Sequence, residues 1–300
     1  MNPLTDFLAS ELDRPVPPEV EQAGRVIASR LGGVAVLFYG SVLRTGDLTG
    51  LLDFYVLREG RSRSAVGRLL WPDVSYHEVN VGGEVVRAKV ATMPLDTFAR
   101  AAQGETLDTT VWARFVQPAA LVWAKGASFR HRTIEAVGDA AMTASRFAAL
   151  HGPEHADAIT FWRALFRATY AAELRVEAPG REDQILGYDQ LRYKTLLPLA
   201  WREAGVDFEQ HGDDLSPRLP EPKIIALASA WLRLERAGKR LNLARLMKAA
   251  FTFDGATRYA AWKIERHTGM QVMVTPFRER HPIMAAPGVL WQLWRHTVLR

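Results

Sequence analysis

The 300-residue chain contains no cysteine. This absence excludes a disulfide framework, a zinc site built from thiolates and a cysteine nucleophile. No stretch reaches the roughly 18 uninterrupted apolar residues that a membrane-spanning helix needs. The first residues mix Asp and Glu among the apolar ones, unlike a secretory signal. We therefore expect a cytoplasmic protein that is at most peripheral to the inner face of a membrane.

Several catalytic motifs are also missing. The eight histidines show no spacing typical of a zinc site, and the chain has neither a Gly-x-Ser-x-Gly elbow nor a Walker loop. What is present is an ordinary globular composition, with 48% hydrophobic and 24% charged residues. This length and composition predict a folded protein of two domains, or of one large domain with a helical appendage.

Basic charge is concentrated near the end of the chain. From Arg258 onward there are seven Arg or Lys residues and two Glu, so this part carries a net charge of +5, equal to that of the whole chain. Such a surface favours phosphate groups or anionic lipid as partners. The dense Lys/Arg pattern that usually accompanies nucleic-acid binding is missing, so we expect no nucleic-acid partner.

The pattern of apolar residues predicts an α/β (α+β) domain followed by a mainly helical one. A helix is expected at 18–31 and strands at 36–39, 52–57, 73–80 and 84–92, with Gly82-Gly83 as a hairpin turn. From 96 onward the period is helical, with segments at 95–103, 108–116, 133–150, 157–176, 188–203, 222–237, 241–249 and 255–267. Breaks are expected at a polar stretch around 205–222 and at Gly238. The predicted units are a domain with a small mixed sheet at 1–125, a helical domain at 126–267 and a basic aromatic segment at 268–300.

A turn and a carboxylate near the start of the predicted sheet carry the functional argument. Gly40-Ser41 ends one apolar strand and offers what a phosphate-binding turn needs, a residue without a side chain and a small hydroxyl. Asp53 lies inside the next apolar strand, where a carboxylate is costly unless it is paired or holds a cation. Mg²⁺ shared with triphosphate oxygens would satisfy it. The alternatives are an ordinary turn, and an Asp53 that caps a turn or pairs with an arginine.

This layout resembles the nucleotidyltransferase superfamily, in which an apolar strand, Gly-Ser and a spacer precede Asp-x-Asp or Asp-x-Glu. Tyr55 stands here where the second carboxylate is usual. The segments Tyr39-Gly40-Ser41 and Leu52-Asp53-Phe54-Tyr55-Val56 are similar to those of one branch, the mitochondrial-type phosphatidate cytidylyltransferases (CDP-diacylglycerol synthases of the translocator assembly and maintenance family). That branch has an apolar residue two places after its Asp. Weaker similarities follow in the same order at 86–90, 108–112, 170–175 and 181–183, whereas Val42 replaces a family glycine.

The resemblance implies a set of site residues. Asp53 would hold Mg²⁺, and Tyr39, Gly40 and Ser41 would cradle the nucleotide. Period-2 alternation places Arg87 and Lys89 on one face of their strand, either facing the phosphates or exposed to solvent. Arg175 and Arg181 would neutralise nucleotide or lipid phosphates, with a plain ion-pair network as the alternative.

The C-terminal segment is the predicted membrane contact. Trp291, Trp294 and Val298 fall on one helix face, with Arg295 and Arg300 at its edges. Such a helix suits a membrane interface, and equally it suits docking on the protein core.

The leading hypothesis from the sequence is a Mg²⁺-dependent enzyme that joins CTP and phosphatidic acid into CDP-diacylglycerol and pyrophosphate. The enzyme alternative is a nucleotidyltransferase that acts on another acceptor, such as a soluble phosphate, a sugar or a different lipid. The non-enzyme alternative is a degenerate member that only binds nucleotide or a protein partner, motivated by Tyr55.

Overall fold

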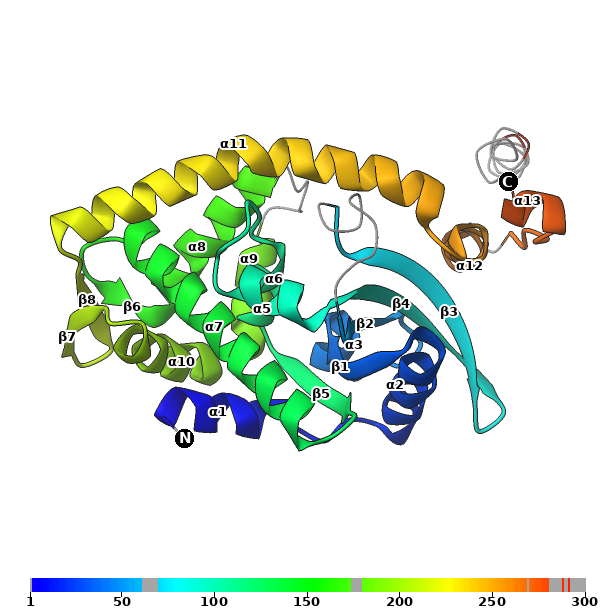
Figure 1. The fold of residues 1–300 in the computed structure, drawn as a ribbon, viewed down its shortest axis with the longest axis horizontal. Coiled ribbons are helices and arrows are strands. Elements are labelled where there is room, and N and C mark those ends of the chain that lie inside the picture. Colours follow the sequence, from blue (N-terminus) through cyan, green and yellow to red (C-terminus); the bar gives the residue numbers. More distant parts are fainter. Residues whose placement is uncertain are drawn as a thin grey trace.

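The computed structural model describes residues 2–60, 70–173, 180–268 and 270–280, together with Gly288 and Trp291. Its centre is a mixed five-stranded sheet in the order β3-β4-β2-β1-β5 (Figure 1). The strands are β1 (Gly33–Tyr39), β2 (Leu52–Arg58), β3 (Asp73–Val81), β4 (Glu84–Pro94) and β5 (Ala119–Ala124). Strand β1 runs antiparallel to both β2 and β5, and β2 runs parallel to β4. Gly82 and Gly83, both at positive φ, join β3 to β4 in the predicted hairpin.

Alternation along the strands gives the sheet two apolar faces. One face packs against α2 (Pro18–Leu31), whose Val20 and Ile27 join a core with Phe38 and Phe54. The other face, which includes Tyr55, packs against α5 (Leu95–Ala102), α6 (Thr110–Phe115) and α7 (Ala127–His151). The sheet is therefore a middle layer between helices.

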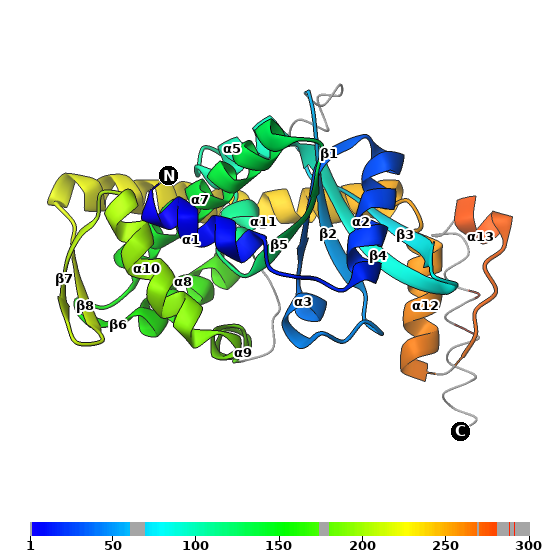
Figure 2. The same ribbon diagram turned by 90° about the horizontal axis from the view of Figure 1, so that it is seen from below.

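Three helices lie beyond one end of the sheet (Figure 2): α8 (Ala158–Glu173), α9 (Arg181–Tyr188) and α10 (Gln190–Glu203). The long α11 (Glu221–Thr252) runs from this helical region to the β3 side of the sheet (Figures 1 and 2). The N-terminal helix α1 (Pro3–Leu12) packs on α7 and α10. A small second sheet contains β6 (Ala156–Asp157), β7 (Asp207–His211) and β8 (Asp214–Arg218).

The chain then returns to the first sheet. The Tyr76 amide on β3 donates to the Asp254 carbonyl at 2.8 Å, just before α12 (Ala256–Thr268), and α13 (Pro276–Arg280) follows. Within the described ranges, no helix combines the length and the apolar character needed to cross a membrane.

The predicted class, an α/β domain with a mixed sheet plus a helical region, is confirmed, and so are the helix at 18–31 and all four predicted strands. The predicted break around 205–222 is also confirmed, and a β-hairpin occupies much of it. Two expectations were wrong. A fifth strand, β5, follows the first helices and returns to the sheet. Gly238 does not break α11, which continues through it. A Cβ there would lie 2.8 Å from the Ala172 carbonyl oxygen, so this glycine permits the close packing of α11 on α8.

Candidate functional site

Gly40 ends β1 in a conformation that only glycine adopts easily. Its φ of 95° and ψ of −162° lie in a region closed to residues with a Cβ. A Cβ at this position would lie 2.7 Å from Asp53 Oδ2. The missing side chain thus lets the backbone turn directly beside the carboxylate, and Ser41 follows as the first residue of α3 (Ser41–Thr45).

Asp53 sits between two strands that contribute neighbours on the same face. Tyr39 of β1 and Lys89 of β4 are its register partners. Among the described residues, no group donates a hydrogen bond to the Asp53 carboxylate. Burial raises its pKa, and the positive charges of Lys89, Arg114 and Arg44 only partly offset this. Within this part of the chain the carboxylate has no fixed donor, which suits it to binding a ligand or a cation.

Tyr55 belongs to the core. It is 1% exposed. It packs edge-on against Phe115, with ring centroids 5.1 Å apart, and also contacts Tyr39 and Phe98. Burial raises the pKa of its hydroxyl, so it stays neutral. The second carboxylate that the resemblance leads one to expect at this position would have to be desolvated among aromatic rings, so the surroundings favour Tyr.

Arg114 of α6 connects this aromatic cluster to the site. Its Nη1 donates to Tyr39 Oη at 2.9 Å, and its guanidinium lies 5.0 Å from the centre of the Tyr39 ring. Burial alone would lower the pKa of Arg114, but the nearby Tyr39, Tyr55 and Asp53 raise it. The group therefore remains a cation held in a fixed position.

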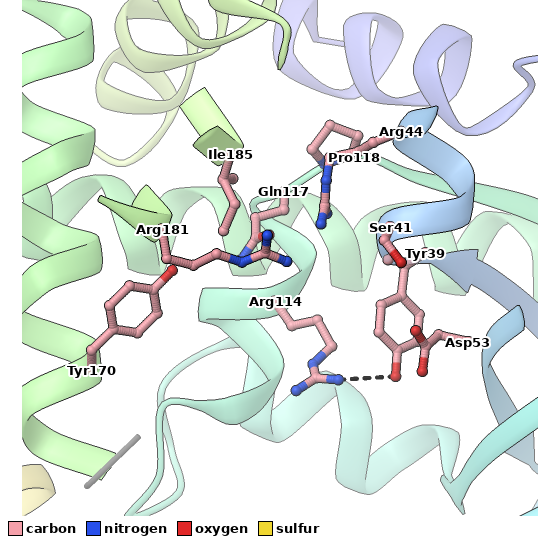
Figure 3. Close-up of a pocket in the computed structure, with 11 residues that line it drawn as sticks. Tyr39, Ser41, Arg44, Asp53, Arg114, Gln117, Pro118, Tyr170, Arg181 and Ile185 are labelled. Atoms are coloured by element: carbon pink, nitrogen blue, oxygen red, sulfur yellow. Dashed lines mark hydrogen bonds between the residues drawn. The ribbon is translucent and has the colours of Figure 1, made fainter. Parts of the chain in front are cut away.

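One wall of a cavity of about 290 Å³ is formed by Tyr39, Gly40, Ser41, Asp53 and Arg114. This volume is near the lower end of the range for small-molecule sites, roughly 300–1,000 Å³. The opposite wall comes from Tyr170 of α8 and from Arg181 and Ile185 of α9, so the cavity lies between the sheet and the helical region (Figure 3).

The cavity gathers more positive than negative charge. Its lining within the described residues includes three arginines, Arg44, Arg114 and Arg181, and a single acid, Asp53. Burial and the nearby Arg181 both lower the pKa of Arg44, and the charge of Asp53 only partly offsets this, because two cations share a site with a single acid. Arg181 also donates to Gln184 Oε1 at 3.1 Å. Such a convergence of guanidinium groups is suited to binding phosphate.

The other residues predicted from the sequence have different surroundings. Lys89 lies beside Asp53 in the sheet. Arg87 shares that face but is paired with Glu78, with Nε 3.7 Å from Oε1, and is not among the residues that line the cavity. Arg175 lies outside the described residues. Of the predicted C-terminal helix only Trp291 is described, and its side chain is exposed.

Sequence reasoning did not assign Arg44, Arg114 or Tyr170 to the site. Arg44 follows Ser41 by three residues, so one helical turn places both beside the cavity, a spacing that could have identified it. Tyr170 opens the 170–175 segment of the resemblance, although only Arg175 of that segment was predicted to bind phosphate. Arg114 comes from α6, far along the chain, and no local pattern marks it.

The side chains that could bind Mg²⁺ at this site would be carboxylates or other metal ligands near the cavity. Within the described residues, no cluster of three or more His, Cys, Asp or Glu side chains is placed to hold a metal. Asp53 alone fits the role of a single protein ligand, because Mg²⁺ often takes one or two carboxylates and completes its coordination with phosphate oxygens and water. The surrounding cations repel a free metal ion, so Mg²⁺ fits only together with a polyphosphate. The cavity does not supply two carboxylates for a two-metal site.

Comparisons of the chain with protein-family models and with curated proteins gave no match.

Proposed function

We propose that this chain is a nucleotidyltransferase that joins CTP and phosphatidic acid into CDP-diacylglycerol and pyrophosphate. The observation that supports this most is the cavity in which Asp53 and the Gly40-Ser41 turn meet three arginines. A triphosphate carries several negative charges, and this arrangement offers cations for the phosphates and one carboxylate for their metal ion. The order of apolar strand, Gly-Ser turn and Asp on the adjacent strand also supports a nucleotidyltransferase-like fold.

The chemistry needs charge neutralisation more than proton transfer. A phosphate oxygen of phosphatidic acid attacks the α-phosphorus of CTP and forms a new P–O bond. The bond from the α-phosphorus to the bridging oxygen breaks, and pyrophosphate leaves with that electron pair. Because the attacking phosphate is already an anion, no strong general base is required.

Within this scheme the arginines have the main role. Arg44, Arg114 and Arg181 would hold the phosphates of both substrates together despite their mutual repulsion, and would stabilise the charge that develops on the leaving pyrophosphate. The Tyr39 hydroxyl would orient Arg114 through their hydrogen bond. Mg²⁺, with Asp53 as its protein ligand, would supply further charge neutralisation at the phosphate oxygens.

The direct test is incorporation of radiolabelled CTP into vesicles that contain phosphatidic acid, with pyrophosphate release followed in parallel. We expect the parent chain to form labelled lipid, Asp53→Ala to lose this activity, and Glu84→Ala, on the exposed β3-β4 turn, to keep it. Absence of product alongside an active control enzyme, or undiminished product with Asp53→Ala, would refute the proposal.

Two alternative functions would use the same cavity. A different phosphate-bearing acceptor would give pyrophosphate release without phosphatidic acid, which a screen of acceptors with each nucleoside triphosphate detects. A nucleotide-binding protein without catalysis is favoured by one observation, the single carboxylate among the described lining residues. Calorimetric binding of CTP with no pyrophosphate release under any condition would support that second reading.

A further inference from the structure

The longest helix of the molecule, α11, has one side that packs on the protein and one that does not. Its 32 residues span about 48 Å along an edge of the molecule (Figures 1 and 2). On the inner side Trp231 and Leu234 are buried, and Gly238 lies against the α8 backbone. The inner side of α11 is therefore packed against the rest of the protein.

The outer side of α11 carries a row of exposed apolar residues. Ile225, Leu232, Leu243 and Met247 are 59%, 49%, 61% and 59% exposed. At about 100° per residue, these positions fall within roughly 60° of one another around the helix axis. They thus form a single stripe, opposite the buried Leu234, which we call the outer stripe.

Basic residues lie along and beside the outer stripe. All four are exposed: Arg233, Arg236, Lys239 and Arg240. The helix contains only two acids, Glu221 at its start and Glu235, which accepts a hydrogen bond from the Trp231 indole at 2.8 Å. No acid follows Glu235 before the helix ends at Thr252. The outer side of α11 is therefore both apolar and positively charged.

Charge argues against a second copy of the chain as the occupant of this surface. The basic cluster lies near the middle of the outer stripe, between Leu232 and Leu243. A two-fold symmetric pairing along the stripe would bring Arg236, Lys239 and Arg240 of each copy against the same residues of the other. Like charges held close together are destabilising.

An anionic bilayer satisfies both properties of the surface. Apolar side chains enter the boundary between head groups and acyl chains, while Arg and Lys stems lie along it and their charged ends reach the lipid phosphates. From this combination we propose that the outer stripe of α11 seats the protein on an anionic membrane surface. The inference concerns a surface distinct from the cavity and does not depend on the proposed reaction.

The test is flotation of the full chain with vesicles of neutral phosphatidylcholine, alone or mixed with phosphatidylglycerol. Phosphatidylglycerol carries charge but lacks the phosphomonoester of phosphatidic acid, so binding is separated from substrate recognition in the cavity. We expect binding to the mixed vesicles only, and weaker binding at high salt. The double variant Leu232→Glu/Leu243→Glu should bind the vesicles at least about tenfold more weakly. It removes two apolar side chains that would enter the bilayer, and it adds two carboxylates that the anionic lipids repel.

Two further variants complete the design. Arg236→Gln and Arg240→Gln should each weaken binding about fivefold, the loss expected for one basic charge near an anionic surface. Leu191→Glu changes an equally accessible apolar residue on α10, 77% exposed, and should leave binding unchanged. Circular dichroism of each variant checks that the fold is retained.

The outcomes are distinct. Unchanged binding of a folded Leu232→Glu/Leu243→Glu variant would overturn the proposal and would assign membrane contact elsewhere, such as the C-terminal segment. Equal binding to neutral vesicles would overturn it as well. So would a dimer in sedimentation that this variant dissociates, since the stripe would then be an interface between copies. Absence of cytidylyl transfer by the parent chain, with vesicle binding intact, would count against the proposed function and not against this surface.

Discussion

Replacing Gly40 with alanine tests whether the turn exists to let the backbone approach Asp53. Two costs follow from the structure. The backbone conformation, at φ 95° and ψ −162°, is open essentially to glycine alone and should cost about 1–3 kcal/mol for alanine. The added Cβ, 2.7 Å from Asp53 Oδ2, forces the carboxylate to move, at about 1–3 kcal/mol for an overpacked site. The expected loss in the free energy of unfolding is thus roughly 2–6 kcal/mol.

Gly46→Ala is the matched control. Gly46 also has a positive φ, 72°, but a Cβ there meets nothing within 4 Å. It should cost only the left-handed conformation, about 1–2 kcal/mol. The entropy that alanine removes from the unfolded chain is common to both variants and cancels in the comparison.

Urea unfolding followed by tryptophan fluorescence gives the two free energies, and calorimetry gives CTP binding. We expect Gly40→Ala to be the less stable by at least about 1 kcal/mol and to lose CTP affinity, while Gly46→Ala retains it. Equal losses of stability in the two variants would refute the reasoning, because contact with Asp53 would then have no energetic consequence.

Three further predictions concern stability and pH. Gly238→Ala should destabilise the fold by about 1–3 kcal/mol, because its Cβ clashes with the α8 backbone. Gly138→Ala in α7 should stabilise the fold by about 0.5–1 kcal/mol, because its Cβ meets no close neighbour. Thermal unfolding of the two variants measures both effects. Tyr39→Phe removes the acceptor of Arg114 and should cost about 1–3 kcal/mol by the same measurement. Because burial raises the pKa of Asp53, its protonation stabilises the fold fully below about pH 3.9, and this contribution is lost as the pH rises through the raised value. Asp53→Asn should therefore be at least as stable as the parent at pH 7 without ligand, a difference that disappears near pH 3; a large loss of stability at pH 7 would contradict this.

Much of the sheet could be predicted from the sequence because its signals are local. Apolar runs bounded by glycine or proline define β1 to β4, and the Gly82-Gly83 turn follows from the freedom of glycine at positive φ. β5 escaped prediction because its short apolar run follows helical segments, and only pairing with β1 makes it a strand. Gly238 was wrongly predicted to break the helix. A glycine that ends a helix and one that lets a neighbouring backbone pack closely look the same in the sequence.

Part of the candidate site could likewise be predicted from the sequence, and part could not. The sequence by itself determined the Gly40-Ser41 turn, the carboxylate of Asp53 and the placement of Arg87 and Lys89 on one face, because each depends on turn chemistry or strand alternation over a few residues. Only the tertiary structure decided that Tyr55 is sealed in an aromatic core, that Arg87 pairs with Glu78, and that guanidinium groups from α3, α6 and α9 converge on one cavity. That convergence joins Arg44 and Arg181, which are 137 positions apart, and it depends on how the helical layers pack against the sheet, which no short-range pattern encodes.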